Sequence, residues 1–205
     1  MTATEDIKWF KTQFKDEINE AIAGTPLTLD FIVALACQET GEVWPVLRAK
    51  GLPVDQIVAL CVGDTLDEDG GRRAFPRTKK QLVEYNPPHG QAMFDVGHRA
   101  LVDMAQHIKG YSKVAKNPDK FCHGYGVFQL DLQFFKEDPD YFLNRDYERF
   151  ANTLERCVRE LNGALSILGY EAKTNLTDLE LVAVGIVYNT GGFTPKKGLK
   201  QGYFD

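Results

Sequence analysis

The residue best suited to acid–base chemistry is Glu39, which stands at the end of an apolar run, FIVALACQETG, over residues 31–41. This run predicts a buried helix that stops near Gly41 and carries one carboxyl group at its C-terminal end. An apolar environment and the negative end of the helix dipole both disfavour a carboxylate, so we expect a raised pKa for Glu39. A carboxyl group that is still protonated near neutral pH is what a general acid requires.

A second informative stretch is FCHGYGVFQLDLQFF, over residues 121–135, in which two glycines flank Tyr125. Glycines at this spacing suit a backbone that turns tightly or lets a ligand approach closely. Polar and apolar residues alternate beyond them, which is typical of a short extended segment with one side toward a cleft. We expect Gln129 and Asp131 to share that side.

A third stretch places an aromatic residue and an amide, Tyr188 and Asn189, at the end of a predicted buried helix. Thr177 and Glu180 form a capping-box signature at the start of this helix. Two readings stay open for its end: a ligand-binding pair, or a core tyrosine followed by an asparagine that caps the helix.

The elements that would position these residues are mostly helical. Apolar residues recur at steps of three or four, which predicts helices over residues 5–23, 28–39, 54–62, 94–111, 147–168 and 177–187. Residues 63–80, rich in Gly, Pro and charge, predict a surface loop. The expected fold class is therefore mainly α, with a small extended or β element within residues 121–135.

Composition narrows the function classes. A chain of 205 residues that is 43% hydrophobic predicts one globular domain over 1–205. A net charge of -5 and a pI near 5.4 argue against a nucleic-acid surface. No apolar stretch approaches the roughly twenty residues that span a bilayer. The N-terminus lacks signal-peptide features, so we expect a chain made in the cytoplasm, or a domain of a longer protein.

Metal, cofactor and disulfide chemistry are not expected. Cys37, Cys61, Cys122 and Cys157 are irregularly spaced, which favours reduced core thiols, with disulfides formed after export as the alternative. The acidic residues between Asp64 and Asp69 could form a solvated loop or a calcium site, although their spacing does not match the usual calcium-loop pattern. No cofactor is predicted.

Three motifs, ALACQETG, HGYGVFQLD and VGIVYNTGG, resemble in the same order the three signature blocks of goose-type lysozymes and the related soluble lytic transglycosylases. Those enzymes cleave the glycan strands of peptidoglycan. The resemblance covers mainly residues 28–41 and 119–192. It implies a lysozyme-like fold in which a small β element lines the cleft.

The resemblance also implies site residues. Glu39 stands where the family has its catalytic acid and Thr40 where it has a small hydroxyl residue. Gly126 opens the segment that aligns with a Gly-Leu-Met-Gln run and Gln129 ends it. Asp131 stands where goose-type lysozymes place an Asp that positions the attacking water. The predicted catalytic residues are Glu39 and Asp131, and the predicted substrate-binding residues are Thr40, Tyr125, Gly126, Gln129, Tyr188 and Asn189.

The sequence departs from the family in two respects. The first two blocks are separated by 87 positions, from Glu39 to Gly126, so residues 42–118 are interpreted as a large insertion. A second family Asp aligns with Lys120, beside Asp119. The identity of a second carboxylate therefore stays open among Asp131, Asp119 and Asp64.

The implied activity is that of a muramidase, which hydrolyses the β-1,4 bond between N-acetylmuramic acid and N-acetylglucosamine. With Asp131 about 6.5 to 9.5 Å from Glu39, the reaction would be an inverting hydrolysis. Without a working second carboxylate, Glu39 would act as acid and then as base, as in a lytic transglycosylase, and leave a 1,6-anhydro sugar. A chitinase or chitosanase and a non-catalytic wall-binding module are further alternatives.

The resemblance, together with the missing signal peptide, also predicts how the protein reaches its substrate. An enzyme that lacks an export signal must reach the periplasm or cell wall by other means. We expect either a phage endolysin or the toxin domain of a secreted antibacterial effector. The expected partners are peptidoglycan strands and, for an effector, an immunity or inhibitor protein.

Overall fold

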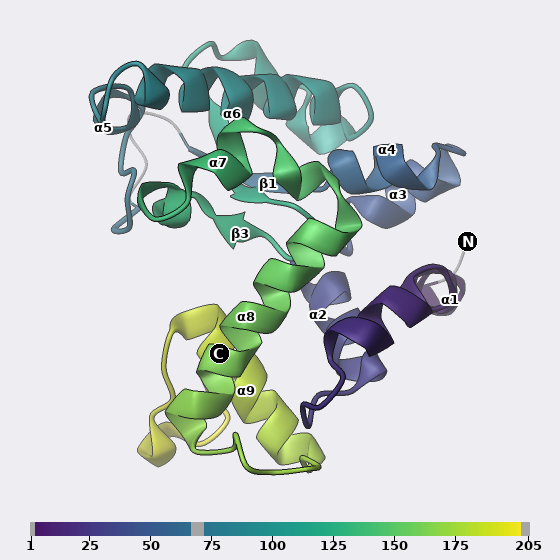
Figure 1. The fold of residues 1–205 in the computed structure, drawn as a ribbon. Helices are drawn as coiled ribbons and strands as arrows, with labels where there is room; N and C mark the ends of the chain where they lie inside the picture. The colour runs from purple at the N-terminus through teal and green to yellow at the C-terminus, as the bar shows by residue number, and fades with distance from the viewer. Residues whose placement is uncertain (1–2, 67–71, 202–205) are drawn as a thin grey trace. The chain divides into compact units, whose positions relative to one another are not determined.

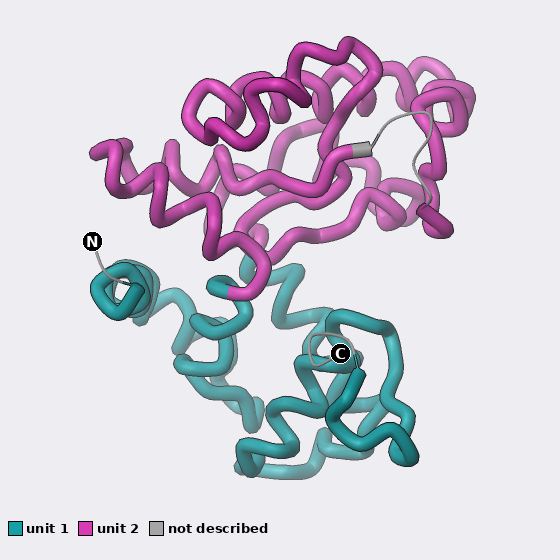
Figure 2. The backbone as a smooth tube through the Cα atoms, turned by 180° about the vertical axis from the view of Figure 1, so that it is seen from behind, with its two compact units in different colours: residues 1–37, 154–205 teal, residues 38–153 magenta. Residues whose placement is uncertain are grey.

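The structure is a computed structural model that describes residues 3–66 and 72–201. It is mainly helical with a small three-stranded antiparallel sheet, which confirms the predicted class at that level. The chain divides into two compact units, residues 1–37 with 154–205 and residues 38–153 (Figure 2). Compact units are not always separate domains, so the single domain over 1–205 stays a prediction.

The first unit consists of helices. Its elements are α1 Ala3–Ala21, most of α2 Leu29–Thr40, most of α8 Phe150–Leu168, α9 Asp178–Thr190 and the short 3₁₀ helix η5 Pro195–Lys197 (Figure 1). Helix α1 buries Phe10, Phe14 and Ile18 on one face, as the step of three or four predicts.

The ends of α8 and α9 follow their local sequence. Gly169 has a φ of 70° directly after α8, the left-handed geometry that favours glycine at a helix stop. The capping box of α9 is present, because Thr177 accepts a hydrogen bond from the Glu180 N–H and the Glu180 carboxylate accepts one from the Thr177 N–H. Gly191 ends α9 with a φ of 74°.

The second unit is built around the sheet. Strands β1 Val62–Leu66, β2 Phe121–Tyr125 and β3 Leu130–Asp131 pair antiparallel in the order β1-β2-β3. The predicted β element within residues 121–135 is confirmed as β2 and β3. The loop predicted over 63–80 is wrong in part, because most of β1 lies in it. Strand pairing with β2, far along the chain, selects the extended conformation there and leaves little local signal.

The second unit also contains helices. They are α3 Trp44–Ala49, α4 Val54–Ala59, α5 Lys79–Val83, α6 His89–Ala105 and α7 Pro139–Leu143, with the 3₁₀ helices η1 Lys109–Tyr111, η2 Val114–Lys116, η3 Leu132–Lys136 and η4 Asp146–Glu148. Helix α6 packs against β1 and β2 (Figure 1). It begins five residues before the predicted start at Phe94, and the 3₁₀ helix η1 covers the end of the predicted range.

The interpreted insertion, residues 42–118, is integrated into this unit. Its strand β1 is a neighbour of β2, which belongs to the second sequence motif, and its helix α6 covers both strands. The segment therefore helps to form the sheet that carries the candidate site.

No helix among the described residues is both long enough and apolar enough to cross a membrane.

Candidate active site

Glu39 lies in the last turn of α2, as the sequence predicts. Its side chain is half-buried, between the exposed Gln38 and the buried Thr40. The carboxyl group therefore sits at the negative end of the helix dipole and partly out of water. This is the setting expected for an acid that must approach a bound substrate.

Thr40 connects the first sequence motif to the second. Its Oγ1 donates a hydrogen bond to the carbonyl oxygen of Val127 over 2.8 Å, and the contact is buried. Thr40 also hydrogen-bonds with the thiol of Cys61. Burial raises the pKa of this thiol to about 12. The helix end beside Glu39 is thus fixed to the turn that follows β2.

This turn has a defined shape. Gly126 has a φ of 78° and Gln129 a φ of 52°, and the Gln129 N–H donates to the Gly126 carbonyl over 3.1 Å. A Cβ on Gly126 would lie 2.3 Å from Thr153 Oγ1, so only glycine fits both the φ and the space. The turn explains why position 126, which opens the segment aligned with a Gly-Leu-Met-Gln run, is a glycine.

The side chain of Gln129 lies on a pair of glycines. Gly63 on β1 and Gly124 on β2 are register partners. A Cβ added to Gly63 would lie 2.8 Å from Gln129 Oε1, and a Cβ added to Gly124 would lie 2.3 Å from the same atom. The amide Nε2 donates to the carbonyls of Gly126, over 2.8 Å, and Cys61, over 3.4 Å. Because both amide hydrogens face backbone oxygens, Oε1 is the atom of this side chain suited to accept a hydrogen bond from a ligand.

Tyr111 belongs to the same neighbourhood and was missed in the sequence. Its hydroxyl lies 3.9 Å from the Cβ position of Gly63, and the backbone of Asp64 hydrogen-bonds with it. Burial raises the pKa of Tyr111, and the nearby Cys122, Asp64 and Glu42 add to this effect. No motif marks this tyrosine, because only the fold of the 42–118 segment brings it to the sheet.

Asp131 is bound by an arginine. Arg72 donates from Nη1 to Oδ2 over 2.7 Å and from Nη2 to Oδ1. The Gln133 N–H also donates to Oδ1 over 2.7 Å, and His123 Nδ1 lies 3.4 Å from Oδ2. Burial alone would raise the pKa of Asp131, but His123, Arg72 and the Gln133 N–H outweigh it and hold that pKa below its usual value. Asp131 is therefore an ionised, heavily hydrogen-bonded carboxylate.

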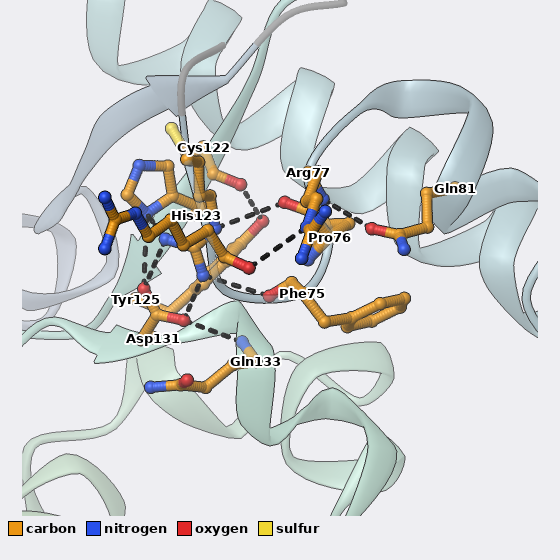
Figure 3. A network of polar contacts seen from close by, with 11 residues as sticks. Phe75, Pro76, Arg77, Gln81, Cys122, His123, Tyr125, Asp131 and Gln133 are labelled. Carbon is orange, nitrogen blue, oxygen red and sulfur yellow. Dashed lines mark hydrogen bonds and ion pairs between the residues drawn. The ribbon is translucent and has the colours of Figure 1, made fainter.

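The remaining N–H groups of Arg72 bind its own loop. Nε donates to the Pro76 carbonyl over 3.1 Å and Nη2 to the Phe75 carbonyl over 3.0 Å, while Nη1 lies 3.1 Å from His123 Nδ1. Figure 3 shows Phe75 and Pro76 in the same network of polar contacts as Asp131 and His123. Arg72 thus attaches residues 72–76 to the edge of the sheet. Nothing in the sequence indicated this pair.

Tyr125 was predicted to contact substrate, and the structure places it in the core. The residue is fully buried, its hydroxyl donates to the Cys122 carbonyl over 2.7 Å, and its ring packs edge-on against Phe142 and Tyr147. A sugar cannot reach this ring. Its place in the motif is explained by packing between β2 and the helices that follow.

The other carboxylates considered as partners of Glu39 differ in setting. Asp119 pairs with Lys79 over 2.6 Å, and Asp64 is exposed on β1. Asp67 and Asp69, part of the calcium alternative, lie outside the described residues. Within residues 3–66 and 72–201 no group of three or more His, Cys, Asp or Glu is arranged to hold a metal ion. The four cysteines form no disulfide.

Tyr188 and Asn189 lie in the last turn of α9, in the first unit, and Glu39, Gln129 and Asp131 belong to the second. Tyr188 is half-buried and Asn189 is exposed. Asn189 does not cap α9, because Gly191 takes that position. A role for both residues in binding substrate stays a prediction.

Comparisons of the chain with family models, with curated proteins and with solved structures give no match.

Proposed function

We propose that the protein cleaves the glycan strands of peptidoglycan at the β-1,4 bond between N-acetylmuramic acid and N-acetylglucosamine, with Glu39 as the general acid. The observation that carries this proposal is the buried hydrogen bond from Thr40 to the Val127 carbonyl. It joins two of the three motifs that resemble goose-type lysozymes and soluble lytic transglycosylases. A lysozyme-like fold with an integrated 42–118 segment is part of the same proposal.

In the first step Glu39 protonates the leaving glycosidic oxygen as the bond from the sugar C1 breaks. Its half-buried position at a helix C-terminus favours the protonated acid that this step requires. Gln129 Oε1 accepts a hydrogen bond from a sugar hydroxyl or acetamido N–H, and the glycines beneath it fix the amide. A role of Tyr188 and Asn189 in binding sugar stays a separate prediction.

The state of Asp131 favours the lytic transglycosylase alternative for the second step. Oδ1 already accepts two hydrogen bonds, and Oδ2 is engaged by Arg72 beside His123. A carboxylate has about four lone-pair sites, and with three of them accepting hydrogen bonds Asp131 is a poor base for a water molecule. Glu39, now a carboxylate, would instead take the proton of the sugar 6-hydroxyl as O6 bonds to C1, which restores the acid and forms a 1,6-anhydro end.

Glu39→Gln tests the proposal directly. Glutamine keeps the size of the side chain and cannot donate a carboxylic proton, so we expect a folded protein that does not lyse purified sacculi. Activity should fall by 10² or more, the size expected for the loss of a general acid. Lysis at the normal rate would remove Glu39 from the mechanism.

Mass spectrometry of the released muropeptides separates the two reactions, because a reducing end and an anhydro end differ by one water. Anhydro ends would support the transglycosylase reading, and reducing ends the muramidase with Asp131 as a working base. Cleavage of chitosan oligomers without muropeptide release would instead indicate a chitosanase. Binding without any product would indicate a wall-binding module.

The proposed activity suits an antibacterial role. A chain of this kind would act on the cell wall after delivery by a secretion system or after phage lysis. An effector would also need an immunity or inhibitor protein in the cell that makes it.

A further inference from the structure

One part of the second unit is positively charged in an otherwise acidic chain. Residues 72–120 contain ten Lys and Arg residues against four Asp and Glu residues, a formal charge of +6. The whole chain contains 24 Lys and Arg residues against 29 Asp and Glu residues, a formal charge of -5. Positive charge is therefore concentrated in one continuous segment, and the proposed function does not account for it.

The fold gathers this segment into one layer. Helix α6 packs against α5, η1 and η2 and also against strands β1 and β2. Lys79 on α5 pairs with Asp119 over 2.6 Å, and His98 on α6 contacts the Lys120 carbonyl over 2.7 Å. Figure 1 shows α5 at one end of α6, with α6 lying along the strands. The charges of α5, α6 and the segment after α6 are thus neighbours in space.

Most of the charged side chains of residues 72–120 are exposed. We call six of them the basic face: Arg73, Arg77, Arg99, Lys109, Lys113 and Lys116. In the part of the chain that the structure describes, none of the six forms an ion pair with a carboxylate. Arg72 and Lys79, from the same segment, do have such partners. The basic face is thus available to anions from outside the chain.

We propose that the basic face binds the carboxylate groups of the stem peptides on peptidoglycan and so holds the strand on the unit that carries Glu39. This inference rests on the proposed function. A chain of net charge -5 is repelled by a polymer that bears free carboxylates on every peptide, and a local positive surface reverses that repulsion within a Debye length of about 8 Å. Lysine ammonium groups on flexible stems suit carboxylates that have no fixed geometry.

The test measures binding to purified sacculi, free of phosphate polymers, by co-sedimentation in the Glu39→Gln background. The variant carries Lys109→Gln, Lys113→Gln and Lys116→Gln. We expect binding about tenfold weaker at low salt, the size expected for three lost surface ion pairs, and a smaller dependence on NaCl. Circular dichroism and thermal unfolding check that the variant is folded.

A matched control removes the same charge from the other unit. Lys8, Lys15 and Lys197 are also exposed, and their replacement by Gln should change binding less than twofold. If both triple variants bind equally, only net charge matters and the basic face is not a binding surface.

A second arm changes the polymer. Carbodiimide coupling with glycinamide converts the carboxylates of sacculi into neutral amides and leaves the glycan intact. The Glu39→Gln protein with an intact basic face should bind these amidated sacculi about tenfold more weakly than untreated sacculi. Unchanged binding would overturn the proposal. Binding of a DNA duplex that exceeds binding to sacculi and is lost in the same variant would also overturn it. Failure of the catalytic proposal appears separately, as lysis retained in Glu39→Gln with Lys109, Lys113 and Lys116 intact.

Discussion

The guanidinium of Arg72 binds both carboxylate oxygens of Asp131, 59 positions further along the chain. Arg72 also binds the backbone of residues 75 and 76, so this one pair connects the loop after β1 to the start of η3. The sequence suggested a catalytic role for Asp131, and the geometry adds a structural one.

Asp131→Asn is expected to destabilise the protein. The two side chains of the pair are 13% and 27% exposed, so the variant leaves a mostly buried Arg72 without its counter-charge. We expect a loss of about 2 kcal/mol in the free energy of unfolding, below the range for fully buried pairs because of the remaining exposure. Urea unfolding measures this loss.

The control for this variant is Asp119→Asn, which removes the more exposed partner of Lys79. It should cost about 0.5 kcal/mol or less. Equal losses in the two variants would show that Arg72 and Asp131 contribute no more than a surface pair. If the protein is a lytic transglycosylase, the Asp131→Asn variant should still form anhydro ends.

The stabilisation from Asp131 should depend on pH. The fold lowers the pKa of this carboxyl group, so the contribution is fully present above the unfolded pKa, which is about 3.9, and is lost as the pH falls through the folded value. The difference in unfolding free energy between the wild type and Asp131→Asn should therefore be constant from about pH 5 to 7 and shrink below about pH 4. Urea unfolding at several pH values measures it. A difference that grows toward low pH would contradict the lowered pKa.

Thr40→Val should weaken both stability and turnover. Valine has a similar shape and leaves the buried Val127 carbonyl without its donor, at a cost of about 1–3 kcal/mol. Because the helix end beside Glu39 is then less well fixed, sacculus lysis should fall about tenfold or more. Thr40→Ser keeps the hydroxyl and should retain most of the lytic activity, as turbidity assays would show. If Thr40→Val is as active as Thr40→Ser, the contact with Val127 does not position the acid.

Gly124→Ala should displace the amide of Gln129. The new methyl group would lie 2.3 Å from Oε1, so the Gln129 side chain must move off the glycine pair. We expect a loss of about 1–3 kcal/mol, measured by thermal unfolding, and weaker substrate binding. Gln129→Ala removes the clash, so the double variant should recover part of the stability.

Gly163→Ala is the matched control for Gly124→Ala. Gly163 lies within α8, is exposed and has nothing within 4 Å of its Cβ position. Alanine there should stabilise the protein by about 0.5–1 kcal/mol. Loss of stability in both variants would mean that the contact with Gln129 is not the cause.

The sequence by itself determined the elements whose stabilisation is local. Apolar spacing gave α1 and α8, the Thr177–Glu180 box gave the start of α9, and Gly169 marked the end of α8. These features depend on residues three or four positions apart or on one backbone angle, so a single sequence reveals them. The position of Glu39 at the end of α2 was predicted for the same reason.

Only the tertiary structure decided the contacts between distant residues. Strand β1 is extended because β2 pairs with it, Tyr125 is buried because other aromatic rings cover it, and Asp131 is ion-paired because the chain returns Arg72 to the sheet. The bond from Thr40 to Val127 likewise spans 87 positions. Such contacts depend on how the chain closes its long loops, and no periodicity or cap in the local sequence encodes them.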